Sequence, residues 1–453
     1  MLKRGQSTFL SVACVWVALA LSGCAETQRP ESTGKGSVRA INAIVDSPDL
    51  VFRNEERSQG NIGFRTTVGF TNWDDLEYTF NFDIFLPDQD DAIRLASQFV
   101  DVVLDTEYSL ALVGSLDDPS VIMWEDAERS WEGTETVFEA DFVHLSPMTG
   151  QVDVYFVLDG AAPVPGEEVG TLSFGERLPF REFPEGDYSL VLTAPNDPAN
   201  VLFTGTAARL APAVRLTVAL FDPDRSITAP VAVNFILSDG AALTPSDINS
   251  PPKARLLNAV FGGVNLDGYF NNDLGAAVFS DVGFSELSTY ADLVDLVTPL
   301  TVTEAGNAAN VVVEQDLQFI GNSFRTMAVY ELAGETQIRA VLDDARPLAT
   351  FPVMRITSFA SNIDFLDIYE QEAGTDITFE FPTFGAITPG VSTAYFSSRE
   401  GMREITVVRT LEKDPIATPL VVDLVNGQII DIIIVDTADP NVVELRVLES
   451  VLP

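Results

Sequence analysis

The sequence predicts an all-β protein built of β-sandwich domains in tandem, and three features of the chain lead to this prediction. Short segments rich in β-branched and aromatic residues recur along the chain, and no long amphipathic helix is convincing. Four segments begin alike at intervals of 102, 114 and 100 residues, the size of a single sandwich domain. A chain of 453 residues also exceeds one compact core of ordinary size.

The first residues have the pattern of a signal peptide. Lys3 and Arg4 supply positive charge, and the apolar run Phe9–Leu21 is too short to span a bilayer as a stable helix. We therefore expect residues 1–23 to be a leader that is removed on export. The alternative is an ordinary secretory leader that happens to contain cysteine.

The leader ends in Leu21-Ser22-Gly23-Cys24, which resembles the lipobox of bacterial lipoproteins. The resemblance implies that the sulfur of Cys24 carries diacylglycerol, that the leader is cut before it, and that the new amine is acylated. Acyl chains contribute about 0.8 kcal/mol per buried CH₂, so such an anchor is effectively permanent. Ala25 stands where many inner-membrane lipoproteins have aspartate, which by resemblance favours the outer membrane.

Residues 24–37 are predicted to hold the lipidated cysteine and a flexible tether. The segment lacks apolar periodicity and is rich in Ser, Thr, Gly and Pro. Cys14 lies within the leader, so the mature chain is expected to have no disulfide. The stability of the folded domains must then come from their hydrophobic cores.

The repeated openings beyond the tether define the expected domains. They are VRAINA from Val38, ADFVHLSP from Ala140, ARLLNA from Ala254 and MRITSF from Met354. In the last three repeats, an aspartate follows the second residue of the opening at the same distance each time, as Asp153, Asp267 and Asp367, and a tyrosine stands two residues after it. The first repeat has Val51 at this position. We expect four β-sandwich repeats arranged as beads on a string, the first divergent. Their predicted ranges are residues 38–138, 139–250, 251–350 and 351–453.

These repeats resemble a bacterial extracellular family known as domain of unknown function 4397. The family opens with V-R-x-x-H-A-S-P and continues with a V-D-V-Y strand and a P-G-x-Y strand. ADFVHLSP, VDVY and PEGDYSLVL give the best match, over roughly residues 140–240. The third and fourth repeats match more weakly, and the first matches only at its opening. The resemblance implies an immunoglobulin-like or transthyretin-like sandwich on an exported protein and brings no activity or site residue.

Three local segments carry more specific expectations. Asn426-Gly427 is the strongest hairpin signal, because both residues tolerate the positive φ of a type I′ turn. The segment from residue 286 to 296 could form a short helix, and residues 315–319 are ambiguous.

The formal net charge of −41 excludes nucleic-acid binding and repels anionic headgroups. The plainer interpretation is a solvated, salt-tolerant surface, and the alternative is binding of divalent cations. The candidate calcium segments are residues 88–91, 117–118, 222–224 and 271–273. None has the twelve-residue loop of an EF-hand, and each also suits a β-turn.

Catalytic residue types are scarce. His144 is the only histidine, and it occupies the repeat position of Asn42, Asn258 and Ser358, so we expect it to bond local backbone. One histidine without cysteine cannot build a zinc site. We therefore predict no catalytic, cofactor-binding or metal-binding residue, and Cys24 as the modified residue.

The recurring aspartates resemble catalytic carboxylates only superficially. Paired-carboxylate hydrolysis needs two groups across one cleft, whereas Asp153, Asp267 and Asp367 lie one per repeat. Alternation predicts that Asp153 and Tyr155 point outward from a half-exposed strand. Alternatively, Asp153 caps the following turn and Tyr155 packs on a sheet edge. A shared ligand-binding face is the third interpretation.

The sequence thus favours a non-catalytic, lipid-anchored protein of the bacterial cell envelope, sorted to the outer membrane. Its four sandwiches would serve binding, adhesion or structural support, with the membrane as one partner and an envelope protein or carbohydrate as another. The alternatives are an extracytoplasmic hydrolase or carbohydrate-binding protein using surface carboxylates, and a stalk stiffened by calcium.

Overall fold

The computed structural model describes residues 31–86, 91–224, 227–293, 296–343 and 345–448. Within these ranges all regular secondary structure is β-strand and no helix occurs, which confirms the all-β prediction. Cys24, the leader and most of the expected tether lie outside the described residues.

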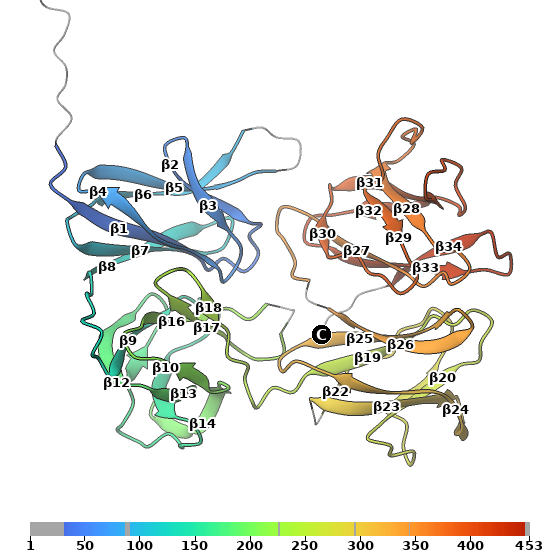
Figure 1. Cartoon of the computed structure of the whole chain (residues 1–453), viewed down its shortest axis with the longest axis horizontal. Helices are drawn as coiled ribbons and strands as arrows, with labels where there is room; N and C mark the ends of the chain where they lie inside the picture. Colours follow the sequence, from blue (N-terminus) through green and yellow to red (C-terminus); the bar gives the residue numbers. More distant parts are fainter. Residues whose placement is uncertain (1–30, 87–90, 225–226, 294–295, 344, 449–453) are drawn as a thin grey trace, which may run out of the picture.

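The strands form four two-sheet sandwiches that follow one another along the chain (Figure 1). Sandwich 1 contains β1 (Lys35–Asn42), β2 (Leu50–Asn54), β3 (Arg57–Ile62), β4 (Thr67–Asp74), β5 (Glu77–Ile84), β6 (Ile93–Asp101), β7 (Thr106–Gly114) and β8 (Pro119–Ala127). Sandwich 2 contains β9 (Val137–His144), β10 (Val152–Leu158), β11 (Gly170–Leu172), β12 (Arg177–Pro184), β13 (Gly186–Ala194), β14 (Asp197–Thr204), β15 (Ala208–Leu210), β16 (Arg215–Phe221), β17 (Ala232–Leu237) and β18 (Ala242–Leu243).

The second half of the chain is built in the same way. Sandwich 3 contains β19 (Lys253–Asn258), β20 (Leu266–Phe270), β21 (Phe279–Val282), β22 (Ala291–Asp292), β23 (Val297–Glu304), β24 (Asn307–Gln318), β25 (Phe324–Leu332) and β26 (Glu335–Leu342). Sandwich 4 contains β27 (Val353–Ser358), β28 (Leu366–Glu372), β29 (Phe384–Ile387), β30 (Phe396–Ser397), β31 (Gly401–Arg409), β32 (Leu420–Leu424), β33 (Ile429–Asp436) and β34 (Val443–Leu448).

One strand order recurs in all four sandwiches. The sheet that holds the opening strand has the orders β4-β1-β7-β8, β12-β9-β16-β17-β18, β22-β19-β25-β26 and β30-β27-β33-β34, and we call it the opening sheet. In each, the opening strand pairs in parallel with a strand from the end of the sandwich, for example β1 with β7. The facing sheet has the orders β3-β2-β5-β6, β11-β10-β13-β14, β21-β20-β23-β24 and β29-β28-β31-β32. Sandwich 1 therefore has this topology although Val51 replaces the recurring aspartate.

Each sandwich is held by apolar side chains between its sheets. The core of sandwich 2 is aromatic, with Phe138, Phe142 and Phe156 in mutual contact. That of sandwich 4 is aliphatic, with residues such as Ile356 and Ile432 fully buried. Burial of one such side chain contributes about 1.5–3 kcal/mol, so these cores stabilise the fold without a disulfide among the described residues.

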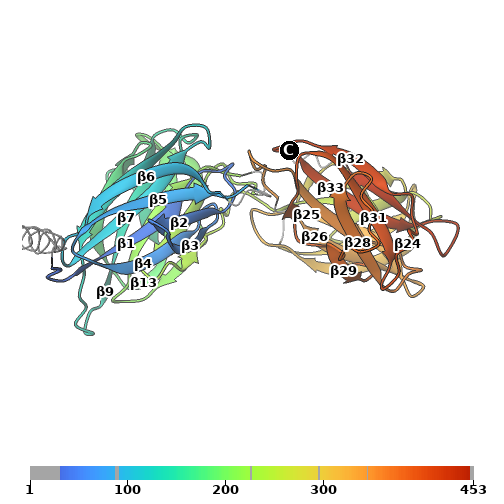
Figure 2. The same cartoon turned by 90° about the horizontal axis from the view of Figure 1, so that it is seen from above.

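The sandwiches pack in two pairs, so the expectation of beads on a string is wrong. Figure 2 shows two lobes, one of sandwiches 1 and 2 and one of sandwiches 3 and 4. The opening sheets face each other in each lobe. Their shared clusters include Ile41 with Val143 in the first lobe, and Leu257 with Phe359 in the second. The opening strands are buried on both faces, and most of their buried side chains are apolar, as is typical of strands covered on both sides.

The first lobe also contains a close backbone contact. Phe70 N donates to Ser238 O at 3.2 Å. A Cβ atom on Gly69 would lie 2.3 Å from Asp239 O, so only glycine fits this position. Sandwiches 1 and 2 therefore meet through backbone as well as side chains.

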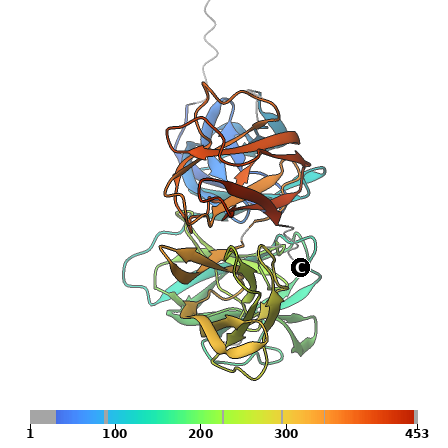
Figure 3. The ribbon, with the colours of Figure 1, turned by 90° about the vertical axis from the view of Figure 1, so that its right-hand side faces the viewer.

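The two lobes are joined by the segment between sandwiches 3 and 4. Arg346 Nη1 donates to Val45 O at 2.7 Å and to Ser47 O at 2.6 Å, and its guanidinium stacks on Phe64 at 5.3 Å. Ala349 N donates to Asp46 O at 2.9 Å. Sandwiches 1 and 4 consequently lie on one level and sandwiches 2 and 3 on the other (Figures 1 and 3).

The local expectations have mixed outcomes. Asn426-Gly427 forms a turn in which Gln428 N donates to Val425 O, but β32 and β33 belong to different sheets, so the hairpin prediction is wrong. Only Gly427 of the two has positive φ, so the type I′ prediction is wrong too. The described residues between 286 and 296 contain β22 and no helix. The ambiguous segment up to residue 318 belongs to β24.

Candidate functional site

The predicted lipidation site lies outside the described residues. The anchoring of Cys24 therefore stays a prediction. In the ranges that the structure does describe, no helix is long and apolar enough to cross a bilayer.

His144 has a structural role at the end of β9. Its side chain is fully buried, Nε2 donates to Gly150 O at 3.0 Å, and Nδ1 accepts from Ser146 N at 3.3 Å. Burial lowers the pKa of His144 below its usual value, which favours the neutral ring. At the matching positions, Asn42 and Asn258 also bond local backbone, as the sequence predicts. The buried hydroxyl of Ser358, by contrast, has no hydrogen-bond partner among the described residues.

The recurring aspartates lie on the strand face opposite the core, as alternation predicts, because Val152, Val154 and Phe156 face the core and Asp153 and Tyr155 do not. That outer face is covered, so the expectation of a half-exposed strand is wrong. Asp153 is 5% exposed and Tyr155 2% exposed. Asp153 Oδ1 accepts from Thr171 Oγ1 at 2.5 Å and Oδ2 from Asn196 N at 2.7 Å. The carboxylate thus links β11 to the turn between β13 and β14, a turn much farther along the chain than the one that directly follows it.

The same link recurs in the second lobe. Asp267 accepts from Asp281 N at 2.8 Å and from Gly306 N at 2.9 Å. Asp367 accepts from Ala386 N at 2.9 Å and from Leu411 N at 3.3 Å. The structure places these aspartates in separate sandwiches and does not bring them together. Hydrogen bonds offset the cost of burying each charge.

The candidate calcium segments serve as turns where they are described. Asp222 Oδ1 accepts from Met148 N at 2.9 Å and from the hydroxyl of Ser146. Asn271 and Asn272 adopt positive φ in a turn. Over the described ranges, no group of three or more His, Cys, Asp or Glu side chains could hold a metal ion.

A buried ionic cluster lies between sandwiches 3 and 4. Arg355 bonds Asp343 at 2.7 Å and Asp431 at 2.8 Å, and Arg255 lies 3.7 Å and 3.6 Å from the same two aspartates. Tyr395 donates to Asp431 at 3.0 Å, and burial together with that charge raises the pKa of the tyrosine. The adjoining cavity is about 10 Å³, close to the lower limit for one water molecule. The cluster therefore joins two domains and has no room for a ligand.

A wide, polar pocket lies on sandwich 4, the red unit of Figure 1. Its cavity of about 500 Å³ is within the usual range for ligand sites. The lining comes from β28, the loop after it, the end of β30, and β31. The lining residues are Glu370, Gln371, Glu372, Thr375, Glu380, Ser397, Ser398, Arg399 and Arg403.

The pocket has a fixed floor. Glu370 Oε1 accepts from Arg403 Nε at 2.6 Å and from Ser398 Oγ at 2.7 Å. Both Glu370 and Arg403 side chains are 10% exposed, so the ion pair is largely shielded from water.

One rim of the pocket is a rigid aromatic loop. Phe379 and Phe381 flank the lining residue Glu380, and each is 91% exposed. Lys413 Nζ donates to Glu380 O at 2.6 Å, to Ile377 O at 3.0 Å and to Tyr369 Oη at 2.8 Å. The loop is therefore held from below while its two phenyl rings face solvent. Exposed apolar side chains in a fixed array are typical of interaction surfaces.

Sandwich 3 lacks this site, although it has the same topology. Phe279 follows its paired residue Gly268 by 11 positions, whereas Phe384 follows its paired residue Ile368 by 16. Where sandwich 4 has Glu370, sandwich 3 has Phe270, which packs against Phe279 at 5.6 Å. The longer loop between Ile368 and Phe384, and Glu370 in place of the phenylalanine of sandwich 3, thus create the pocket.

Sequence reasoning missed this pocket. A signal was present in FEFPTF, residues 379–384, where aromatic residues stand on both sides of a proline in a loop region. The partners Ser398 and Arg403 are about thirty residues away and could not be assigned without the fold.

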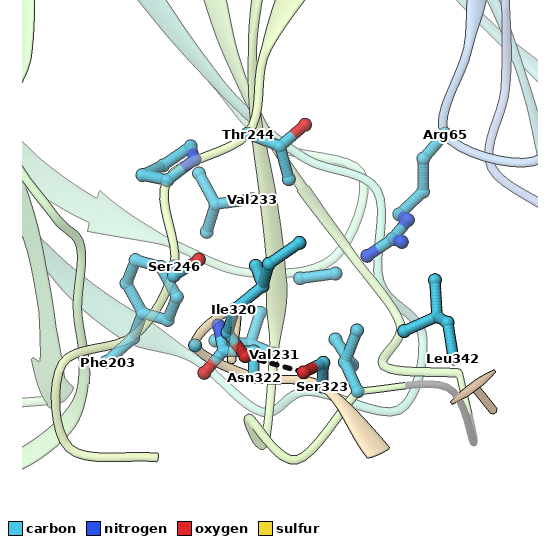
Figure 4. A pocket seen from close by; sticks show the side chains of 14 residues that line it. Arg65, Phe203, Val231, Val233, Thr244, Ser246, Ile320, Asn322, Ser323 and Leu342 are labelled. Atoms are coloured by element: carbon cyan, nitrogen blue, oxygen red, sulfur yellow. Dashed lines mark hydrogen bonds between the residues drawn. The ribbon is translucent and has the colours of Figure 1, made fainter. Parts of the chain in front are cut away.

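A second cavity lies where sandwiches 1, 2 and 3 meet (Figure 4). It measures about 290 Å³ and is lined mainly by apolar side chains, including Phe203, Val231 and Ile320. Arg65 points toward it and lies 3.6 Å from Asp224, which offsets its charge. This cavity thus lies at the junction of the two lobes and combines an apolar wall with the polar side chains of Arg65, Thr244, Ser246, Asn322 and Ser323.

Comparison with known proteins identifies one segment of the chain. Residues 36–155 match the family described as domain of unknown function (DUF4397). The match covers sandwich 1 and the first strands of sandwich 2, so the expectation that sandwich 1 would match only at its opening is wrong. Sandwich 1 keeps the shared strand order despite its altered residues, and the family model recognises it.

No curated protein matches the sequence. Among solved structures, "The Bacillus anthracis TIE protein" is 11% identical to this chain, with a TM-score of 0.16. The alignment covers 89% of this chain and 69% of the chain of that protein. A similarity that low carries no argument about this chain. Residues 36–155 are thus similar to a domain family of unknown function, and this similarity covers about a quarter of the chain.

Proposed function

We propose that this chain is a non-catalytic, lipid-anchored protein of the bacterial cell envelope that binds a ligand through sandwich 4. In this proposal its four sandwiches are tandem copies of one repeated domain. The observation that carries the binding role is the pocket of about 500 Å³ with its rigid, exposed aromatic rim. The DUF4397 match and the all-β fold support an extracellular role.

The state of the pocket carboxylate favours binding over hydrolysis. Glu370 is held in an ion pair with Arg403 and accepts a second hydrogen bond from Ser398. A carboxylate that acts on a substrate must be free to contact it, whereas these bonds hold Glu370 against its own neighbours, with only 10% of the side chain exposed. We therefore favour recognition over hydrolysis at this pocket.

The anchor is supported by the sequence LSGC and the polar segment after it. A lipid on Cys24 would tether the two lobes through the residues before β1. Membrane attachment would then need no spanning segment, because several acyl chains suffice.

The anchor is tested by replacing Cys24 with serine in the full chain. We expect the wild-type protein to incorporate an alkyne-labelled palmitate analogue and to fractionate with membranes, and Cys24→Ser to lose both. Ser22→Thr, which keeps the cysteine, is the matched control. Continued palmitate incorporation by Cys24→Ser would overturn the anchor.

The absence of catalysis has a separate test. The soluble chain from residue 25 onward is screened against glycoside, ester and peptide substrates. Turnover that Glu370→Gln abolishes would contradict the non-catalytic role and favour the hydrolase. Protease treatment of intact cells then separates surface display from a periplasmic location.

A further inference from the structure

We propose that the sandwich 4 pocket binds a neutral oligosaccharide, with one sugar in the polar cavity and the next stacked on the aromatic loop. This inference rests on the proposed binding role and names its ligand class. Two observations carry it: the mixed polarity of the lining and the two exposed phenyl rings beside the cavity.

The lining offers both donors and acceptors of hydrogen bonds. Three glutamates and two arginines line the cavity together with the hydroxyls of Thr375, Ser397 and Ser398. A sugar hydroxyl donates and accepts at once, so it can satisfy a carboxylate and a guanidinium that stand side by side. An ammonium group can only donate, and a phosphate can only accept, so each would leave half of this lining unmatched.

The aromatic loop supplies the apolar part of the site. The C–H face of a pyranose ring is apolar and packs on the face of a phenyl ring. Phe379 and Phe381 remain exposed because Lys413 bonds the carbonyls of Ile377 and Glu380 beneath them. A loop fixed before binding loses little conformational entropy when the ligand arrives.

The surrounding charge argues against other occupants. Asp376 and Glu412 add negative charge to the same loops, and the whole chain carries −41. Anionic membranes and acidic polysaccharides are therefore repelled. A cationic peptide would be drawn to the rim, but Arg399 and Arg403 in the lining oppose its entry into the cavity. The negative surroundings and the arginines of the lining together favour an uncharged, hydroxyl-rich ligand.

The test measures binding of chitohexaose, cellohexaose and maltohexaose to the complete mature chain with serine at Cys24. Isothermal titration and saturation-transfer NMR give the affinity and the sugar protons in contact. We expect at least one hexaose to bind. The double variant Phe379→Ala/Phe381→Ala should weaken that binding about tenfold or more.

Phe99→Ala is the matched control. Phe99 is 53% exposed on β6 of sandwich 1, far along the chain from the site, and this variant should bind as the parent does. Equal losses in Phe99→Ala and in the loop variant would show a non-specific effect and overturn the site. Failure of all three hexaoses, or preferential binding of octalysine or of phosphatidylcholine vesicles, would overturn the ligand class.

These outcomes are independent of the anchor. A protein that takes up palmitate and resides in the envelope, yet binds no hexaose, contradicts only this inference. A protein that binds a hexaose but fails to take up palmitate contradicts only the proposed anchoring.

Discussion

At the scale of single residues, the side chains that recur at matching positions of the sandwiches hold the backbone in place and take part in no reaction that we propose. His144, Asn42 and Asn258 each bond backbone where the opening strand ends. Asp153 and Asp367 each tie an edge strand to a distant turn. A residue type that recurs at one position of a repeated fold therefore reports a constraint of that fold.

The buried histidine gives a pH prediction. Burial lowers the folded-state pKa of His144, so the unfolded chain takes up a proton first as the pH falls. The free energy of unfolding should be insensitive to His144 above pH ~6.5 and should decrease below it. His144→Asn, which installs the residue of sandwiches 1 and 3, should flatten this slope. Urea titrations at pH 7.5, 6.5 and 5.5 test it.

Carboxylates also contribute to the pH dependence of the free energy of unfolding in that experiment. They are shared by both proteins, and His144 is the only histidine, so the difference in slope isolates this ring. Parallel pH profiles for the parent and His144→Asn would contradict the assignment.

At the scale of elements, the opening sheets decide how the sandwiches associate. Their outer faces carry apolar residues and a charged residue at the second position of each opening: Arg39, Asp141, Arg255 and Arg355. Each of these side chains is buried and meets a partner. Arg39 Nη2, for example, donates to Thr217 Oγ1 at 2.5 Å across the first lobe. Such a pattern favours one relative position of two sheets, because a slip would leave a charge unpaired.

The ionic cluster of the second lobe gives a stability prediction. Asp431→Asn leaves Arg355 with one fewer charge partner in a buried site and should cost about 3–5 kcal/mol of the free energy of unfolding. Glu444→Gln on β34 is the control, because it breaks a pair with Arg446 that is about half exposed. An exposed pair contributes about 0–1 kcal/mol. Denaturant unfolding monitored by circular dichroism tests both, and equal losses would refute a special role for the cluster.

At the scale of the whole molecule, four sandwiches form two lobes joined by few contacts. Within each lobe the opening sheets share an apolar cluster, whereas the segment around Arg346 holds sandwich 1 against the second lobe. Each lobe is thus the unit that excludes water, and the connection between lobes is the weaker part of the assembly.

The joint between lobes is open to a direct test. Arg346→Ala removes hydrogen bonds to Val45 and Ser47 and the stacking on Phe64. We expect the radius of gyration from small-angle X-ray scattering to increase while the melting of each lobe changes little. Arg209→Ala is the control, since it removes an exposed pair with Asp187 within sandwich 2. An unchanged scattering curve for Arg346→Ala would show that other contacts hold the lobes.

The sequence by itself determined the all-β class, because strand-length apolar runs and turn residues are local signals. It also predicted the backbone role of His144, since the same position holds asparagine in two other repeats. Only the tertiary structure decided the pairing of the sandwiches, the burial of Asp153 on the outer face of its strand and the pocket around Glu370. Each of these depends on contacts between residues far apart in the chain: Asp153 meets Asn196, and Glu370 meets Arg403. Alternation assigns one buried face to a strand, and it fails where a second sheet or a distant turn covers the other.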